Sequence, residues 1–239
     1  MAGINAYKFT RNEEPLVIKR SEGYIGVLID DLVNKGTNEP YRMFTSRAEY
    51  RILLRQDNAD LRLTPIAKSI GMKHMDDRME RVKQKLDNKK AIEKYFEKYS
   101  IDPDVINSRL SELGSSPIKQ KVRLKSVLSR PNISVPTLLE VLPEVKAHLA
   151  QYDEETINLA EVSLKYEGYI KREQEMVDKM NRLEQVKLTD TVNYHDLVSL
   201  SLEAREKLTE IKPKTIGQAS RISGVSPSDV SVLLVHMGR

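Results

Sequence analysis

The chain has 239 residues, of which 31% are charged and 39% hydrophobic, and its net charge is +4. That length allows one large domain or two smaller ones, and no stretch approaches the roughly 20 consecutive apolar residues that span a bilayer. The absence of cysteine excludes disulfides, thiolate metal sites and cysteine nucleophiles. Because no export signal opens the chain, we expect a cytoplasmic protein.

The charge is unevenly placed along the chain. Residues 1–100 hold 20 Lys and Arg against 15 Asp and Glu, and residues 101–150 hold 7 against 5. Residues 151–239 hold 12 against 15 and are therefore acidic. We expect a polyanion to meet the first two thirds of the chain, and a protein partner to meet the last third.

The hydrophobic pattern predicts a mainly α fold, a helical bundle with a small β-hairpin near the N-terminus. The first nine residues resemble the end of a helix. The run Gly26–Val33 is rich in β-branched residues, and Tyr41–Thr45 alternates in type. With the turn signal at residues 34–36 between them, these two segments predict the hairpin.

From Ser46 onward the signal is helical. Ser46 and Glu49 have the spacing of a capping box, which predicts a helix that runs to about Arg55. A short helix follows from Thr64 to Gly71, and a long one over 76–99. Prolines between residues 103 and 143 then predict several short helices of the bundle type.

The longest predicted helix covers residues 153–187, where Gly168 marks a bend or a close contact. Three helices follow in the tail, over 201–211, 215–223 and 226–237, the last with Ser226 as its cap. We divide the chain into three predicted regions, which are residues 1–75, 76–150 and 151–239.

An arginine cluster is the first stretch that could bind a ligand. On the predicted helix, Arg47, Arg51 and Arg55 are spaced four apart and share one face, with tyrosines interleaved. Arginine forks match phosphate oxygens, and aromatic rings stack on unpaired bases. The alternative, which composition alone favours, is that these arginines pair with nearby acidic residues. The full cluster is Arg42, Arg47, Arg51, Arg55 and Arg62, and the acidic residues are Glu39, Glu49, Asp57 and Asp60.

A second basic run contains Lys119, Lys121 and Lys125. On a helix, Lys121 and Lys125 would share a face and could contact a phosphate backbone. A solvated helix surface explains the run equally well, so both interpretations stay open.

Residues 218–230 have the outline of a DNA-binding helix-turn-helix. A recognition helix needs polar and basic side chains to reach base edges. Here the second helix is almost wholly apolar, and Asp229 lies in its first turn. We therefore expect a core or partner helix and no DNA binding. The four histidines lie at no metal-ligand spacing, and no glycine-rich phosphate loop is present.

Residues 23–63 carry a far more specific signal, the string GYIGVLIDDLVNKGTNEPYRMFTSRAEYRILLRQDNADLRL. It closely resembles a stretch of the glucose-inhibited division protein A family, also called MnmG. Residues 204–237 and 165–170 resemble the same family. Its members are FAD-dependent enzymes that modify the wobble uridine of certain tRNAs by carboxymethylaminomethyl addition.

The resemblance implies that this chain is the C-terminal part of such an enzyme. It implies FAD and NADH in the full-length protein, a homodimer, and the GTPase MnmE as partner. Residues 1–75 would then contain the end of the FAD domain and a linking segment. Because the family's glycine-rich loop and catalytic cysteines would lie upstream, we expect this chain alone to be inactive and to bind no flavin and no metal.

By resemblance, the basic residues become RNA-binding candidates and the tail becomes the partner-binding candidate. The alternative is a purely structural helical module that docks the GTPase without binding tRNA itself. In the first interpretation the partner residues are Gly217, Arg221 and Gly224, and the tRNA residues are Arg42, Arg47, Arg51, Arg55, Arg62, Lys119, Lys121 and Lys125.

Overall fold

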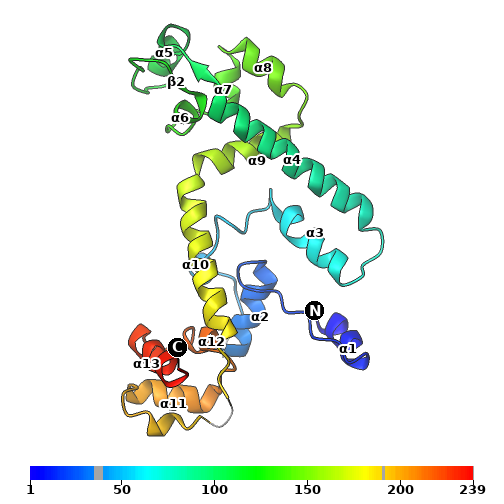
Figure 1. Cartoon of the computed structure of the whole chain (residues 1–239), viewed down its shortest axis with the longest axis vertical. Coiled ribbons are helices and arrows are strands. Elements are labelled where there is room, and N and C mark those ends of the chain that lie inside the picture. Colours follow the sequence, from blue (N-terminus) through cyan, green and yellow to red (C-terminus); the bar gives the residue numbers. More distant parts are fainter. Residues whose placement is uncertain (35–39, 190–191, 239) are drawn as a thin grey trace. The chain divides into compact units, whose positions relative to one another are not determined.

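The computed structural model describes residues 1–34, 40–189 and 192–238. Within them the chain is mainly α-helical, as predicted, and its sheet is a single pair of two-residue strands (Figure 1). The chain forms two units. Unit 1 comprises Met1–Leu54 and Arg172–Arg239, and unit 2 comprises Arg55–Lys171.

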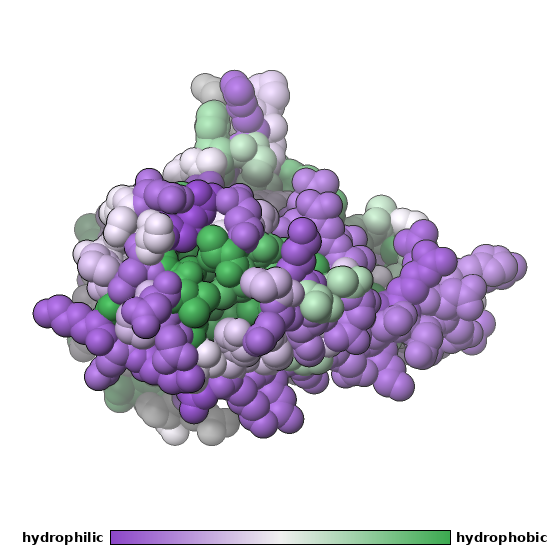
Figure 2. All heavy atoms as spheres, turned by 90° about the horizontal axis from the view of Figure 1, so that it is seen from above, coloured by the Kyte–Doolittle hydropathy of each residue, from purple (hydrophilic) through white to green (hydrophobic). Residues whose placement is uncertain are grey.

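Unit 2 is built around one long helix, which packs on the helices before and after it. Its elements in chain order are α3 (Ala59–Ser69), α4 (Asp76–Lys98), β1 (Ser100–Ile101), α5 (Pro103–Glu112), β2 (Val122–Arg123), α6 (Leu124–Leu128), α7 (Val135–Leu139), α8 (Pro143–Leu149) and α9 (Glu154–Lys165). Helix α4 contacts α3, α6 and α9, and β1 pairs antiparallel with β2. Figure 2 looks down on the face that carries α5 and α8, where hydrophobic residues show through a ring of hydrophilic ones.

The sequence predicts α4 correctly because its apolar residues keep the helical period. Val82, Ile92 and Phe96 are buried, and the remaining surface of the helix is dominated by charge. Asp76 and Asp77 lie in the first turn, where the partial positive charge of the helix N-terminus favours carboxylates. The helix thus presents one stripe to the core and a broad charged face outward.

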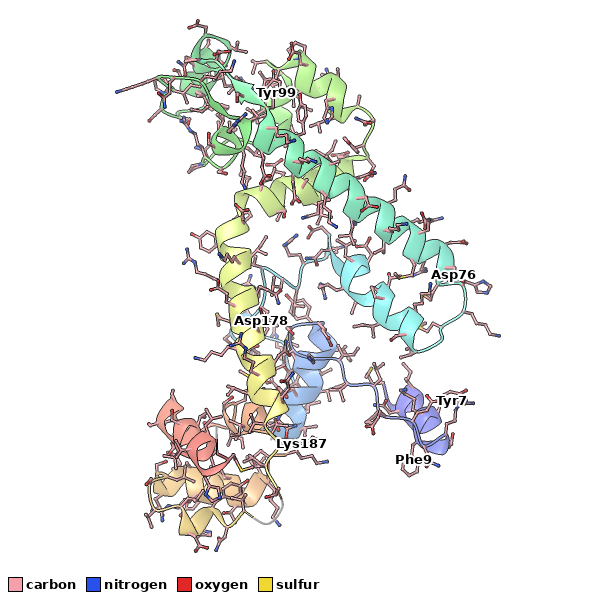
Figure 3. All side chains as sticks on the ribbon, viewed as in Figure 1. Tyr7, Phe9, Asp76, Tyr99, Asp178 and Lys187 are labelled. Carbon is pink, nitrogen blue, oxygen red and sulfur yellow. The ribbon has the colours of Figure 1, made fainter. Side chains whose placement is uncertain are left out.

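Unit 1 joins the two ends of the chain. Its elements are α1 (Ala2–Thr10), α2 (Tyr24–Asn34), η1 (Thr45–Arg47), most of α10 (Glu167–Gln185), η2 (Tyr194–Asp196), α11 (Leu202–Ile211), α12 (Ile216–Ala219) and α13 (Pro227–His236). One small core joins Val27, Tyr50 and Leu54 to Val177 of α10. A second core lies within residues 188–233. Helix α1 buries no residue, and Tyr7 and Phe9 project from it into solvent (Figure 3).

The predicted hairpin strand at Gly26–Val33 is wrong, because this segment is part of helix α2. The buried residues Val27, Asp31 and Asn34 have helical spacing, and a short apolar run cannot be assigned by β-branched content alone. Tyr41–Thr45 forms no strand either. The predicted turn extends into residues 35–36, which lie outside the described residues.

The predicted helix from Ser46 to Arg55 is also wrong. A short 3-10 turn, η1, ends at Arg47, and Ala48 is extended. Glu49 caps no helix, because its carboxylate accepts hydrogen bonds from Arg20 instead. Arg47, Arg51 and Arg55 therefore do not share a helix face. The next helix, α3, begins at Ala59 and contains Pro65 in its interior.

Farther along, the prediction is right about helix content and wrong about continuity. The helix predicted over 153–187 is two helices, α9 and α10, which meet at Tyr166. Lys121 and Lys125 do not share a helix, because β2 separates Lys121 from the start of α6. The first and third tail helices are confirmed, the middle one ends early at Ala219, and Ser226 and Asp229 form the capping box of α13.

Across the residues that the structure covers, no helix is both long enough and apolar enough to cross a membrane.

Candidate nucleic-acid and partner interface

Arg20 is the centre of an ion-pair network in unit 1. Its side chain is 7% exposed and donates hydrogen bonds to Asp30 (2.9 Å), Asp31 (2.8 Å) and Glu49 (2.7 Å). Burial by itself lowers the pKa of Arg20, but the hydrogen bonds with Glu49 and Asp31 outweigh it and raise that pKa above its ordinary value. The guanidinium thus stays charged and ties residue 20 to α2 and to the segment after η1.

Arg47 contacts the same network through Asp31. The Asp31 carboxylate is 1% exposed and accepts hydrogen bonds from the Tyr41 hydroxyl at 2.8 Å and from Arg47 at 3.5 Å. The Arg47 guanidinium lies 5.0 Å from the centre of the Tyr41 ring. Burial and the bond with Asp31 raise the pKa of Tyr41. Arg47, which was predicted to meet RNA, therefore makes internal contacts with Asp31 and with the Tyr41 ring.

Arg221, on the turn after α12, extends the network to the C-terminal helices. It is largely buried and donates to both carboxylate oxygens of Asp30, at 2.9 and 2.8 Å, and to Glu184 at 2.6 Å. Burial by itself lowers the pKa of Arg221, but the hydrogen bonds with Asp30 outweigh burial, so the pKa lies above its ordinary value. Arg221 therefore connects α2, α10 and α12 within unit 1.

The two predicted partner-site glycines lie against acidic side chains. A Cβ at Gly217 would lie 2.5 Å from the Cδ of Glu184, the residue that also accepts a hydrogen bond from Thr215. Gly224 has φ +94°, a conformation that favours glycine, and a Cβ there would lie 2.5 Å from Glu203. Both glycines allow close approach, so their role is in shaping α12 and the turn that follows it.

A cleft of about 250 Å³ opens beside this network. Apolar side chains line much of the cleft, and its charged residues are Lys19, Arg20, Asp30, Glu184 and Arg221. The network satisfies the arginine donors with carboxylates from the same unit, so the cleft offers a ligand mostly apolar surface. The apolar residues are Val17, Ile18, Ile29, Val33, Val177 and Met180.

The other arginines of the predicted RNA cluster differ in exposure and pairing. Arg55 pairs with Asp57 at 2.9 Å, which confirms that part of the internal-pairing alternative, and Arg62 donates to Asn58 and to the carbonyl of Arg55. Arg42 is exposed, 5.5 Å from the ring of Phe44, and Arg51 is exposed. Among the residues described, neither Arg42 nor Arg51 forms an ion pair.

The lysine run of unit 2 is mostly paired. Lys121 contacts Asp102 at 3.0 Å, and Lys125 contacts Glu97 at 2.9 Å and Glu167 at 3.0 Å. The hydrogen bond with Glu97 is the main reason why the pKa of Lys125 is raised. Lys119 is exposed and forms no ion pair with any residue that the structure describes.

Sequence reasoning missed Arg20, and no local signal marks it. Its partners Asp31 and Glu49 lie 11 and 29 residues away. The helix-turn-helix outline does correspond to α12 and α13, but Asp229 is buried and accepts a bond from the backbone of Ser201, so the start of α13 faces its own unit. No group of three or more His, Asp or Glu in the described ranges could hold a metal ion.

Comparison with known proteins identifies the helical regions. Residues 76–174 match the family model "tRNA modifying enzyme MnmG/GidA C-terminal helical domain". Residues 176–239 match "tRNA modifying enzyme MnmG/GidA C-terminal helical bundle". The fold thus has the two helical parts found at the C-terminal end of a class of tRNA-modifying enzymes.

The chain belongs to the MnmG/GidA family. It is 52% identical over 239 residues to the tRNA uridine 5-carboxymethylaminomethyl modification enzyme MnmG of Cytophaga hutchinsonii, and 49% identical over 243 residues to that of Parabacteroides distasonis. These matches cover all of this chain but only 38% and 39% of the relatives. The form II crystal structure of Aquifex aeolicus GidA matches with a TM-score of 0.77 and 33% identity, over 100% of this chain and 36% of that one.

Proposed function

We propose that this chain is the tRNA-binding and partner-docking region of an enzyme that adds a carboxymethylaminomethyl group to the wobble uridine of tRNA. The proposal rests on the match of the whole chain, at 52% and 49% sequence identity, to relatives named for that modification. The chain spans about 38% of the length of the relative in Cytophaga hutchinsonii. We assign FAD, NADH and the reacting groups to the remainder of such a protein, which would act in the cytoplasm as a homodimer.

The proposed tRNA contacts are the exposed cations of the predicted set. Among the residues that the structure describes, Arg42, Arg51 and Lys119 pair with no carboxylate that would compete with a phosphate. Arg42 also lies beside Phe44, whose ring is 50% exposed and available for stacking on a base. In this proposal Arg47, Arg55 and Arg62 stabilise the protein backbone around the exposed arginines. Lys121 and Lys125 add positive charge to the surface of unit 2 near Lys119.

Binding of a fluorescent tRNA transcript, measured by anisotropy between 50 and 200 mM salt, tests this proposal. Arg42→Gln with Arg51→Gln should weaken binding and lower the salt slope by about one per lost phosphate contact. The matched control, Lys187→Gln with Lys212→Gln, removes two exposed cations elsewhere in the same unit and should change neither quantity. Unchanged affinity and slope in the arginine variant would contradict the assignment.

The second candidate is a protein-interaction module that docks the MnmE GTPase without holding tRNA. The observation that favours it is apolar exposure on the C-terminal helices, where Leu202 is 64% and Val235 75% exposed. Gly217, Arg221 and Gly224 would then hold this surface in shape. No measurable tRNA binding, together with capture of the GTPase that Leu202→Asp and Val235→Asp abolish, would support this candidate over the first.

A further inference from the structure

One face of α4 carries a row of lysines that the sequence analysis did not single out. Lys83, Lys90, Lys94 and Lys98 are all exposed. At 100° per residue, their side chains leave the helix within an arc of about 80°, opposite the buried stripe, and the row is about 22 Å long. Asp87 is the only acidic residue in that arc between Lys83 and Lys98.

The row differs from the other lysines of the same helix in its pairing. Lys85 contacts Asp60 at 3.0 Å and Glu155 at 2.6 Å, and Lys89 contacts Glu93 at 2.6 Å. None of the four lysines of the row forms an ion pair with a residue in the described ranges, 1–34, 40–189 and 192–238. The four lysines outnumber Asp87, the one carboxylate within their arc, so the row keeps a net positive charge and attracts anions.

The composition of this face favours a phosphate backbone over an acidic protein. Protein interfaces are anchored by aromatic and other apolar side chains and are depleted in lysine. Helix α4 exposes none of the large hydrophobic side chains that other elements of the described chain expose. Lysine, in contrast, serves as a point charge for phosphate groups in nucleic-acid binding.

The C-terminal half of α4 is held rigidly beneath the row. Phe96 is completely buried, and the Tyr95 ring stacks on His148 of α8 with 3.8 Å between ring centres and on Tyr99 with 5.4 Å. In Figure 3, Asp76 and Tyr99 mark the two ends of the helix. The charges are thus presented on a fixed surface, which lowers the entropy cost of binding an extended anion.

We propose that Lys83, Lys90, Lys94 and Lys98 bind the sugar–phosphate backbone of RNA, independently of its base sequence. The inference rests on the proposed function, since it names a further RNA surface on the same chain. The row lies on unit 2 and contains none of the residues that the sequence predicted to bind RNA.

The test is a tRNA anisotropy titration of the 239-residue chain across 50–200 mM salt. Lys90→Gln with Lys94→Gln should weaken binding by about tenfold at the lower salt and reduce the slope of log K against log salt by about two. The control variant is Lys171→Gln with Lys179→Gln, which removes two exposed lysines from α10 and should leave both quantities unchanged. Because all these side chains are exposed, the circular dichroism of each variant should match the wild type.

The outcomes separate this inference from the proposed function. Wild-type chain that fails to bind tRNA would overturn the proposed function and this row with it. Wild-type binding that the α4 variant leaves unchanged would overturn only the row. Equal competition by polyglutamate of matched charge would also overturn the assignment to RNA and indicate an acidic protein partner.

Discussion

The ion-pair network of unit 1 and the lysine row of α4 use positive charge in opposite ways. In the network, Arg20 and Arg221 are buried and their guanidinium groups are occupied by Asp30, Asp31 and other carboxylates. In the row, the lysine side chains are exposed and form no ion pair with any residue in the described part of the chain. Basic residues that are equivalent in a charge count therefore serve as internal braces in one region and as candidate ligand contacts in the other.

The largest expected effect comes from breaking the network at its centre. Arg20→Met should destabilise the chain by about 3 kcal/mol or more, because it leaves the buried Asp31 carboxylate with weaker partners. Chemical denaturation followed by circular dichroism measures this loss. Arg51→Met is the matched control, since Arg51 is exposed and forms no ion pair among the described residues, and its removal should change stability by less than about 0.5 kcal/mol. Equal losses in both variants would show that the network does not brace the unit.

A smaller loss is expected where the network meets α12. Gly217→Ala places a methyl group against the Glu184 side chain and should cost about 1–3 kcal/mol, because Glu184 is held by Arg221 and Thr215. Gly168→Ala is the matched control, since a Cβ there meets open space. It should stabilise α10 by up to about 1 kcal/mol. The two urea midpoints should therefore move in opposite directions.

Asp229 is a buried carboxylate whose hydrogen-bond donors are neutral, unlike the carboxylates of the ion-pair network. Its donors are the backbone N–H and hydroxyl groups of Ser201 and Ser226. Burial raises its pKa, but hydrogen bonds from Ser201 and Ser226 outweigh burial and lower it below the ordinary value. A lowered pKa in the folded state means that this carboxylate stabilises the fold near neutral pH and that the contribution is lost as the pH falls below about 4. Asp229→Asn should cost about 1–2 kcal/mol at pH 7 and progressively less as the pH falls below about 4, as urea denaturation across this pH range can measure.

The sequence predicted those parts of the fold that depend on local spacing. Helix α4 and the capping box of Ser226 and Asp229 were correct because periodicity and capping act within a few residues. Helix α2 was missed because its buried polar residues, Asp31 and Asn34, broke the apolar pattern that would have marked it as helical. The buried Asp31 carboxylate is satisfied by Arg20, Tyr41 and Arg47 from outside the helix, whereas Asn34 bonds to Asp30 one turn earlier.

The candidate site was harder to predict for the same reason. Whether an arginine braces the fold or faces solvent depends on carboxylates far away in the sequence, such as Asp31 for Arg20 and Asp30 for Arg221. In α4, lysines with and without an ion pair among the described residues lie in one charged segment, and composition does not distinguish them. Lys89 pairs with Glu93 at i, i+4 spacing in the same helix, whereas the pairing of Lys85 with Asp60 and Glu155 depends on the three-dimensional fold.

The smallest expected effect on stability is at the lysine row, and it has the opposite sign. Replacing Lys94 by Gln removes its two like-charge pairs at i, i+4 spacing, with Lys90 and Lys98, and one opposite-charge pair at i, i+3 spacing, with Glu97, so stability should rise by roughly 0.2–0.5 kcal/mol at low salt. The gain should vanish in 1 M salt, where the Debye length is about 3 Å. Thermal unfolding at both salt concentrations measures it. A loss of more than about 1 kcal/mol would mean that Lys94 braces unit 2, and the contrast with the Arg20 network would no longer hold.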